Sequence, residues 1–339
     1  MSEVDLGIQR WRDPAWLAEV HGWVATQLDR ADVVVTGASD HPRSSPWSTI
    51  LTFPTDRGTV WFKANAVGMR HEAALYEVLL RRSPQHVLEP VASDPDRGWL
   101  LLPDGGSTMR AVEGAATDLP AWERMLREHA ELQRELVPYA DEVLAAGVPD
   151  ARPQRLPVIR EALLADRAMC RVGAEDGLSE DEYDRLLAGA PAYAEACARL
   201  DAYGVPASLQ HDDLHDHNVF VPEDRTAPLR VFDWGDAVVG HPFGVLLVSL
   251  RVVAHLVKLD HGAPELLRLR DAYLEPWSAE FDRTSLVEAA RLASRVGGVT
   301  RADCYRRALL EATPAGWAEF GDAVPSWLAE VGKPTPIEP

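Results

Sequence analysis

The sequence predicts an α+β fold of two lobes, a small antiparallel sheet with one helix followed by a larger, mostly helical unit. Residues 32–63 are rich in β-branched side chains and are interrupted by Gly, Pro and Asp-Arg-Gly turn signals, which is typical of antiparallel strands. After the Asp-Gly-Gly sequence at residues 104–106, most segments have the apolar spacing of amphipathic helices. We therefore expect one lobe at residues 1–103, a hinge at 104–106 and the second lobe at 107–339.

The first lobe should contain a hairpin whose strands, Ser48–Phe53 and Thr59–Lys63, flank a turn with Pro and Gly. Residues 67–82 then place apolar side chains three and four positions apart, which predicts the one helix of this lobe. Two further strands are expected at residues 86–93 and 97–103. Together these elements form a sheet with a helix inserted before its last two strands.

The second lobe should be helical except at one place. Residues 119–137 carry apolar side chains on one helical face, and residues 181–203 and 244–330 are mostly helical by the same criterion. The exception is a short pair of apolar segments, Val219–Val221 and Leu229–Phe232, which a polar turn separates. We therefore expect a small hairpin inside the helical lobe, entered by a strongly polar loop.

The composition is that of a globular protein, because 46% of the 339 residues are apolar and 26% are charged. No apolar run is long enough to cross a bilayer and the N-terminus lacks a signal-peptide pattern, so we expect a cytoplasmic protein without a membrane partner. The net charge of −19 disfavours nucleic acid as a partner and favours a cationic small molecule. Three widely spaced cysteines argue against a disulfide framework, and nothing in the sequence specifies an oligomeric state.

The polar loop His211–Asn218 holds three histidines, three aspartates and an asparagine in eight positions, and two interpretations are open. In the first, the three histidines and Asp212 bind a transition metal, which would make the protein a metal-dependent phosphohydrolase. In the second, Asp213 acts as a base while Asn218 and the downstream Asp233 bind Mg²⁺ for phosphoryl transfer. The histidines would then only shape the loop.

Two residues of the first lobe favour the second interpretation. Lys63 ends a strand, is one of only three lysines among 34 basic residues, and could reach nucleotide phosphates from the sheet. The alternative is a strand-end lysine that extends its ammonium into solvent. Glu72 lies on the apolar face of the next helix, where an unpaired carboxylate is costly, so we expect it to pair with Lys63.

The loop His211–Asn218, together with the sequence Val-Phe-Asp-Trp-Gly-Asp at residues 231–236, resembles the H-G-D-L-H-x-x-N and I-D-W motifs of the aminoglycoside phosphotransferase family. The resemblance extends from about residue 30 to 250 in the order of elements. It implies a protein-kinase-like fold and transfer of the γ-phosphoryl group of ATP, or of GTP, to a hydroxyl of a small molecule. A nucleotide-binding regulatory pseudokinase is the other alternative, although every phosphotransfer residue is present.

The resemblance also implies roles for individual residues. Asp213 would orient the acceptor hydroxyl, and Asn218 and Asp233 would bind Mg²⁺. Lys63 would contact the nucleotide phosphates, and Glu72 would hold Lys63. The nucleotide site would further include the hinge residues, which bind adenine through their backbone, and a serine at the phosphates: Leu101, Leu102, Pro103, Gly105 and Ser45.

The sequence departs from the family motifs in three ways. Asp212 replaces the usual glycine before the catalytic aspartate, and Gly-His-Pro at residues 240–242 replaces Gly-Asp-Pro. The segment expected to cover the phosphates, residues 39–48, contains no glycine, so serine hydroxyls and backbone N–H groups would have to serve there.

Acidic residues near the loop and in later helices suggest the kind of acceptor. Carboxylates around the transferred group would attract an ammonium-bearing molecule, and the net charge would reinforce this effect. We therefore expect a cationic acceptor rich in hydroxyl groups, such as an aminoglycoside or an amino sugar. The acids in question are Asp212, Asp216, Asp236, Glu275, Glu280 and Asp282.

Overall fold

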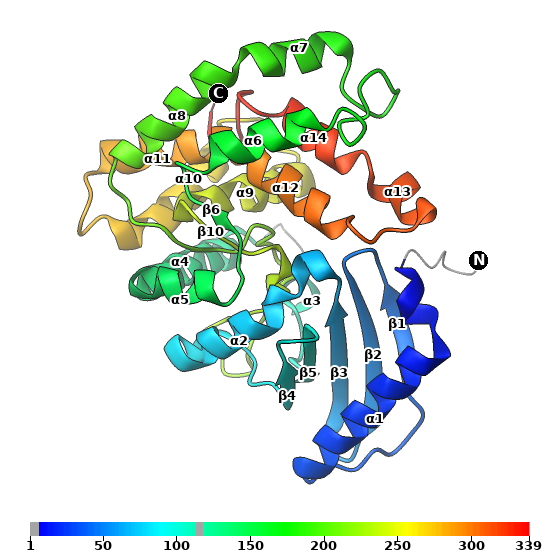
Figure 1. Cartoon of the computed structure of the whole chain (residues 1–339). Helices are drawn as coiled ribbons and strands as arrows, with labels where there is room; N and C mark the ends of the chain where they lie inside the picture. Colours follow the sequence, from blue (N-terminus) through cyan, green and yellow to red (C-terminus); the bar gives the residue numbers. More distant parts are fainter. Residues whose placement is uncertain (1–6, 113–117, 339) are drawn as a thin grey trace.

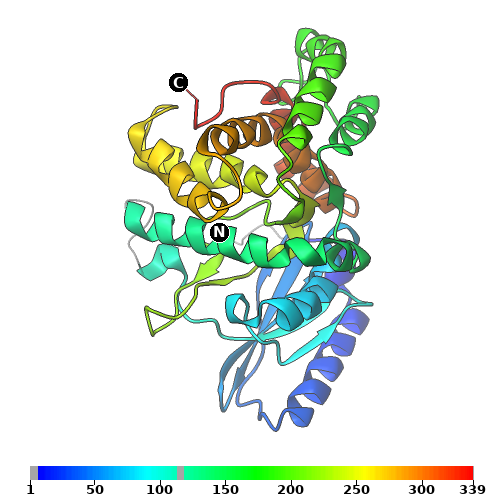
Figure 2. The same ribbon diagram turned by 90° about the vertical axis from the view of Figure 1, so that its left-hand side faces the viewer.

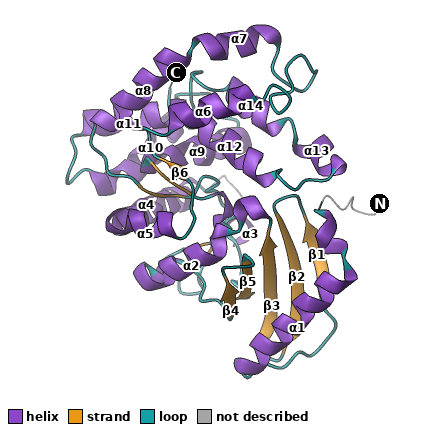
Figure 3. Ribbon diagram, in the orientation of Figure 1, coloured by secondary structure: helices purple, strands orange, loops and turns teal. Residues whose placement is uncertain are grey.

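The computed structural model describes residues 7–112 and 118–338. Residues 1–6, 113–117 and 339, which the two expected lobes include, lie outside the described residues. Figure 1 shows a lower lobe built on a sheet and an upper lobe built from helices. The strands gather in the lower lobe and helices fill most of the upper one (Figure 3). Within the described residues, no helix is long and apolar enough to cross a membrane.

The lower lobe contains a five-stranded antiparallel sheet in the order β1-β2-β3-β5-β4. Strands β2 and β3 pair from end to end through a tight turn at Gly58, whose φ of +102° is accessible mainly to glycine. The predicted hairpin is therefore confirmed. The strands are β1 (Asp40–Ser44), β2 (Ser48–Thr55), β3 (Gly58–Asn65), β4 (Ala92–Asp94) and β5 (Trp99–Pro103).

Two α-helices accompany this sheet, whereas we expect only one. Helix α1 (Pro14–Arg30) begins at an N-cap in which the Asp13 carboxylate accepts from the Ala15 N–H at 2.8 Å. Its buried residues Val20 and Val24 pack with aromatic and aliphatic side chains of the sheet, and Figure 1 shows the helix lying along the strands. Helix α1 thus covers one face of the sheet and leaves the other for the lobe boundary.

Helix α2 (His71–Arg82) is the helix that the sequence predicts, but it starts later than expected. A short 3₁₀ turn, Val67–Met69, precedes it. A Cβ on Gly68 would lie 2.1 Å from the carbonyl oxygen of Arg307, so only glycine fits at this contact with the helical lobe. The first turn of α2 is therefore seated against the other lobe, and this turn carries Glu72.

The upper lobe surrounds two small β-structures. Helix α4 packs on α10, and in Figure 2 it lies across the base of the helical lobe, next to the sheet lobe. Trp122, Trp234, Phe243 and Tyr273 are fully buried in the core of this lobe. Its helices are α3 (Met109–Val112), α4 (Leu119–Leu136), α5 (Ala140–Ala145), α6 (Leu156–Ala165), α7 (Glu180–Ala188), α8 (Ala190–Ala202), α9 (Leu246–Val257), α10 (Pro264–Leu274), α11 (Arg283–Val296), α12 (Gly298–Ala308), α13 (Pro314–Phe320) and α14 (Ala323–Ala329).

The two β-structures flank the polar loop. A three-stranded sheet has the order β6-β10-β7, and the predicted hairpin is present as β8 paired with β9. The loop connects β7 to β8, so one of its ends is fixed in each structure. These strands are β6 (Asp150–Ala151), β7 (Ser208–Gln210), β8 (Val219–Phe220), β9 (Arg230–Val231) and β10 (Val238–Gly240).

Candidate active site

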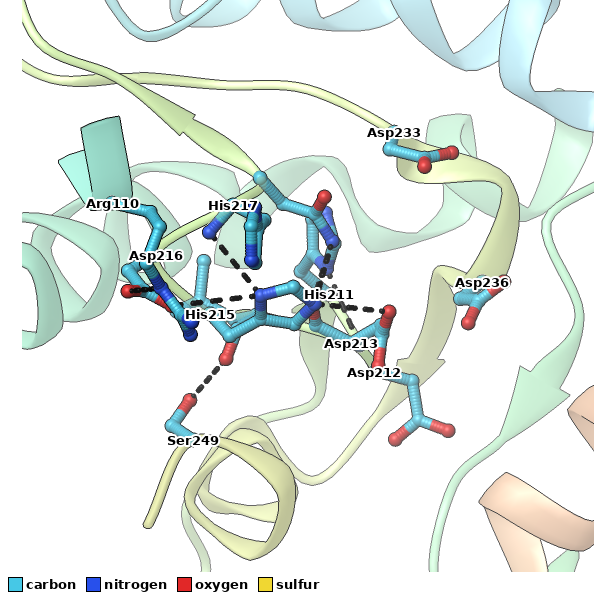
Figure 4. Close-up of polar contacts among 12 residues, drawn as sticks. Arg110, His211, Asp212, Asp213, His215, Asp216, His217, Asp233, Asp236 and Ser249 are labelled. Atoms are coloured by element: carbon cyan, nitrogen blue, oxygen red, sulfur yellow. Dashed lines mark hydrogen bonds and ion pairs between the residues drawn. The ribbon is translucent and has the colours of Figure 1, made fainter. Parts of the chain in front are cut away.

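The loop at residues 211–218 is held by hydrogen bonds from two sides. His211 is fully buried, and its Nε2 lies 2.9 Å from the carbonyl oxygen of Phe232, just after β9. On the other side, the Ser249 hydroxyl of α9 donates to the carbonyl of Leu214 at 2.7 Å (Figure 4). His211 therefore shapes the loop, which agrees with a structural role for this histidine.

Asp213 presents a half-buried carboxylate between two basic side chains. Its Oδ1 lies 3.2 Å from Nη2 of Arg301, and its Oδ2 lies 3.5 Å from Nε2 of His215. Burial alone would raise the pKa of the Asp213 carboxyl, but Arg301 and His215 lower it below its ordinary value. Asp213 is therefore ionised at neutral pH, which suits a group that accepts a hydrogen bond from a hydroxyl.

The β8–β9 hairpin brings Asn218 and Asp233 to the same end. The Phe232 N–H donates to the carbonyl of Asn218 at 3.0 Å, and the Asn218 side chain donates to the carbonyl of Asp213 at 3.0 Å. The amide oxygen of Asn218 is therefore the side-chain atom left to bind a cation. Asp233 has a φ of +61°, which is uncommon for a residue other than glycine and recurs at functional sites. An amide and a carboxylate oxygen fit the preference of Mg²⁺.

Lys63 lies at the centre of the lobe boundary. Its Nζ is 2.6 Å from Oε2 of Glu72 and 2.6 Å from Oδ1 of Asp233. Burial lowers the pKa of Lys63, but the two carboxylates outweigh it and leave the pKa above its ordinary value. Glu72 also accepts from the Trp234 N–H at 2.9 Å. The expected Lys63–Glu72 pair is confirmed, and Lys63 is 8% exposed rather than extended into solvent.

The predicted hinge residues lie at the end of β5 and just beyond it. Leu101 is fully buried and its carbonyl accepts from the N–H of Val91, just before β4, at 2.7 Å, so this carbonyl is used within the sheet lobe. Leu102 and Pro103 are half-buried at the end of the strand, and Pro103 offers only its carbonyl. A Cβ on Gly105 would lie 2.4 Å from the Phe220 ring, so the chain passes directly over this ring.

Phe220 is a candidate site residue that sequence reasoning missed. Its ring stacks on that of Phe232, with centroids 4.1 Å apart. Neither side chain is fully buried, and both lie on the β8–β9 hairpin beneath the hinge. The signal in the sequence was an aromatic residue on each arm of the polar hairpin. The stacked pair forms an apolar surface next to the predicted hinge.

The segment between β1 and β2 uses the predicted serine differently from expectation. Both the N–H and the hydroxyl of Ser45 donate to the carbonyl of Ser48, at 3.0 and 2.9 Å, so Ser45 closes the turn. The neighbouring Ser44 has a buried hydroxyl with no hydrogen-bond partner among the described residues. Burial would raise the pKa of Asp233, but Lys63 and, to a smaller extent, Arg43 lower it below its ordinary value. A phosphate contact by Ser45 remains a prediction, and Arg43 and Ser44 are further candidates.

The histidines of the loop do not assemble a transition-metal site. Across residues 7–112 and 118–338, no group of three or more His, Cys, Asp or Glu side chains could hold a metal ion. His215 instead lies near the carboxylates of Asp213 and Asp216, which outweigh burial and raise its pKa to about 9. The geometry therefore favours the phosphoryl-transfer interpretation of the loop.

Arg301 of α12 is the second site residue that sequence reasoning missed. The side chain is 3% exposed, and its guanidinium lies 3.2 Å from Asp213, 2.8 Å from Asp236 and 3.9 Å from Asp212. These acids therefore do not form the free negative cluster on which the expected cationic acceptor was based. The other acids are also engaged: Asp216 with Arg110, Glu275 with Arg127, Glu280 with Arg134, and Asp282 as the N-cap of α11.

Some of these groups line one small cleft of about 80 Å³ between the lobes, whereas Lys63, Glu72 and Asn218 are not among its lining residues. Figure 4 shows Asp213, Asp233 and Asp236 around the same open space. Arg43 from the sheet lobe and Arg301 from the helical lobe also line it. The remaining lining residues are Trp47, Cys304, Tyr305 and Ala308.

A two-lobed fold in which a strand lysine pairs with a helix glutamate, beside a cleft lined by two aspartates, is typical of protein-kinase-like phosphotransferases. A family model described as the phosphotransferase enzyme family (APH) matches residues 45–285. The chain belongs to this family and is a small-molecule kinase. The curated proteins contain no match to it.

Solved structures share the fold at low sequence identity. The GDP and kanamycin complex of APH(2″)-IIia is 15% identical with a TM-score of 0.57, covering 90% of this chain and 95% of that chain. A macrolide 2′-phosphotransferase type I is 15% identical with a TM-score of 0.56, covering 93% and 97%. An ethanolamine kinase from Plasmodium vivax is 10% identical with a TM-score of 0.55, covering 86% and 80%.

Proposed function

We propose that this small-molecule kinase transfers the γ-phosphoryl group of ATP, with GTP as the alternative donor, to a hydroxyl group of its acceptor. The observation that carries the proposal is Lys63, whose ammonium lies 2.6 Å from both Glu72 and Asp233 beside the cleft that Asp213 lines. Phosphoryl transfer requires a lysine fixed in this way near the phosphates. A nucleotide donor is also supported by the structural neighbour that binds GDP.

Each residue contributes by position and charge. Asp213, ionised and held by two basic side chains, would accept the hydrogen bond of the acceptor hydroxyl and align it for attack. Asp233 and Asn218 would hold Mg²⁺, which neutralises charge on the phosphate oxygens when bound. Lys63 would contact those oxygens, and Glu72 would keep the ammonium in place.

The nucleotide base would lie under the hinge. The backbone from Leu102 to Gly105 would provide hydrogen bonds to adenine, while the stacked rings of Phe220 and Phe232 would support its face. The same surface suits guanine equally well, so the hinge backbone would decide between ATP and GTP.

The acceptor that we propose is an aminoglycoside or an amino sugar. The local acids lend little support, since Arg301 and other cations pair with them. The net charge of −19 still attracts cations at long range. The structural neighbours include a kanamycin complex, an ethanolamine kinase and a choline kinase. Kanamycin, ethanolamine and choline each carry an amine or ammonium group as well as a hydroxyl.

An acceptor panel tests the proposal. ATP or GTP consumption is measured with Mg²⁺ against aminoglycosides, a macrolide, choline, ethanolamine, neutral sugars and sugar phosphates at two ionic strengths. We expect turnover with an amino-bearing acceptor, a Michaelis constant that rises with salt, and no turnover by Asp213→Asn. A neutral or anionic best acceptor would contradict the proposed acceptor class, and no nucleotide-dependent transfer to any hydroxyl would contradict the transferase role of this cleft.

A further inference from the structure

Arg301 connects the two segments that carry the candidate catalytic groups. One arm of its guanidinium, Nη2, lies 3.2 Å from Asp213 on the loop, and the other, Nη1, lies 2.8 Å from Asp236. Asp236 follows Asp233 by three residues on a short 3₁₀ turn. The planar fork of arginine therefore sets the spacing between the loop and the segment that follows β9.

This placement is costly for the fold alone. A guanidinium that is 3% exposed loses most of its hydration, and its Nε has no hydrogen-bond partner among the described residues. Two of its carboxylate partners, Asp213 and Asp236, also line the cleft. A buried arginine with an unpaired N–H beside the reacting groups indicates a role in the reaction rather than in stability alone.

The helix that carries Arg301 also contacts the sheet lobe. At its C-terminal end, Nη1 of Arg307 donates to the carbonyl of Gly68 at 3.1 Å, in the turn that precedes α2 and Glu72. Met69 packs against Cys304 and Ala308 of the same helix. Helix α12 thus touches both the segment that leads to Glu72 and the loop that holds Asp213.

We propose that Arg301 is a positioning residue of this kinase, which holds the Asp213 carboxylate at a fixed distance from the Asp233 segment. The inference rests on the proposed function, but Arg301 lies beyond the residues that match the family, 45–285. Arg301 binds one carboxylate oxygen of Asp213, and the other oxygen, which lies 3.5 Å from His215, would accept the hydrogen bond of the acceptor hydroxyl. Without Arg301 the carboxylate keeps the longer contact with His215, at 3.5 Å, so it is less well oriented and the chemical step slows while nucleotide binding persists.

The test compares Arg301→Lys, Arg301→Ala and the control Arg306→Ala. Arg306 lies on the same helix, pairs only with Asp303 among the described residues and does not line the cleft. We expect Arg301→Lys to lower kcat by about 10- to 100-fold, because an ammonium cannot bind two carboxylates as a fork, with the Michaelis constant for ATP within about threefold. Added guanidinium should restore Arg301→Ala by about tenfold or more, since the truncation opens a space beside the cleft. Arg306→Ala should behave as wild type and should not respond to guanidinium.

Turnover of the wild type is measured first, because its absence on every acceptor would contradict the proposed function rather than this inference. With an active wild type, an unchanged kcat in Arg301→Lys would overturn the positioning role. A loss of kcat in Arg301→Ala that guanidinium does not restore would also overturn it. Should Arg301→Ala not fold, Arg301→Lys decides the question by the separate changes in kcat and in the Michaelis constant for ATP.

Discussion

The ammonium of Lys63 lies 2.6 Å from a carboxylate oxygen of Glu72, and this contact joins strand β3 to helix α2 inside the sheet lobe. The same ammonium is 2.6 Å from Asp233 of the helical lobe. One lysine thus connects a strand, a helix and a loop from both lobes. A change in the shape of this cation should therefore disturb all three.

Lys63→Arg should lose activity nearly as severely as Lys63→Ala. The charge is kept, but a broad planar guanidinium cannot fit where a compact ammonium lies within 2.6 Å of two carboxylates. Glu72→Gln should be milder, since it misplaces Lys63 without removing it. Steady-state kcat with ATP is the measurement, and Lys333→Arg, at an exposed site, is the matched control. Wild-type activity in Lys63→Arg would show that Lys63 does not contact the nucleotide phosphates.

Asp213→Asn should lower kcat by about three or more orders of magnitude while the affinity for Mg-ATP stays within a few-fold. The asparagine keeps the size of the side chain but loses the charge that orients a hydroxyl. Calorimetric binding of Mg-ATP and single-turnover transfer are measured on the same preparation. Retained turnover would show that another group orients the acceptor.

The purified protein should contain no stoichiometric zinc, manganese or iron, and activity should require added Mg²⁺. The reason is that Asp233 and Asn218 offer oxygen ligands, while the rings of His211 and His215 make other contacts. Asp233→Ala should abolish magnesium-dependent activity, whereas His217→Ala should retain most of it. Elemental analysis and magnesium titration of activity are the measurements. A tightly bound transition metal with ATP-independent phosphoester hydrolysis would reverse the assignment.

Gly105→Ala should raise the Michaelis constant for ATP by about tenfold, with a smaller effect on that for the acceptor. An added Cβ would come within 2.4 Å of the Phe220 ring and displace the surface on which the base is proposed to stack. Gly22→Ala in helix α1, where a Cβ meets nothing within 4 Å, is the control and should leave both constants unchanged. An equal rise in the Michaelis constants for ATP and for the acceptor would show that the base does not bind at Phe220.

Asp212→Asn should stabilise the protein at alkaline pH. Burial raises the pKa of the Asp212 carboxyl to about 7, although Arg301 partly opposes this. Between its unfolded pKa of about 4 and this value the folded state binds more protons, so the stability from this group falls as pH rises. The variant, which cannot ionise, should therefore gain about 1–3 kcal/mol over wild type at pH 8 and much less at pH 4.5.

Urea unfolding at the two pH values measures this difference. Thr300 donates to Asp212 at 3.1 Å, and the oxygen of asparagine can still accept that bond. A stability difference that does not change with pH would mean that Asp212 is ionised throughout this range in the folded protein.

The sequence predicted those parts of the site that depend on local pattern. Lys63, Glu72, Asp213 and Asp233 could be proposed as site residues because each lies in, or directly after, a segment whose local pattern is clear. These segments are a strand, a helix, a polar loop and a hairpin strand. Arg301 could not be inferred in this way. It is one of three arginines on a helix without a distinct apolar face, and only the packing of α12 on the loop brings it to Asp213.

Helix α1 was missed although its sequence has helical apolar spacing. The exposed Gly22 lowers the helix propensity, but apolar residues recur three and four positions apart on one face: Trp16, Leu17, Val20, Trp23, Val24 and Leu28. The helix is stabilised by burial on the sheet, where Trp16 and Trp23 make edge contacts with Phe62 and Trp99. Such tertiary stabilisation is not visible in the segment itself.

The contact of Met69 with Cys304 also gives the protein an intrinsic chemical probe. The Cys304 thiol is 2% exposed and lies where helix α12 meets the sheet lobe, whereas Cys170 and Cys197 are buried within the core of the helical lobe. Alkylation of Cys304, which also lines the cleft, requires the boundary between the lobes to open, while alkylation of the other two cysteines requires the helical core to open. The order and rate of thiol labelling can therefore time lobe separation in the native enzyme, without an introduced dye or an engineered cysteine.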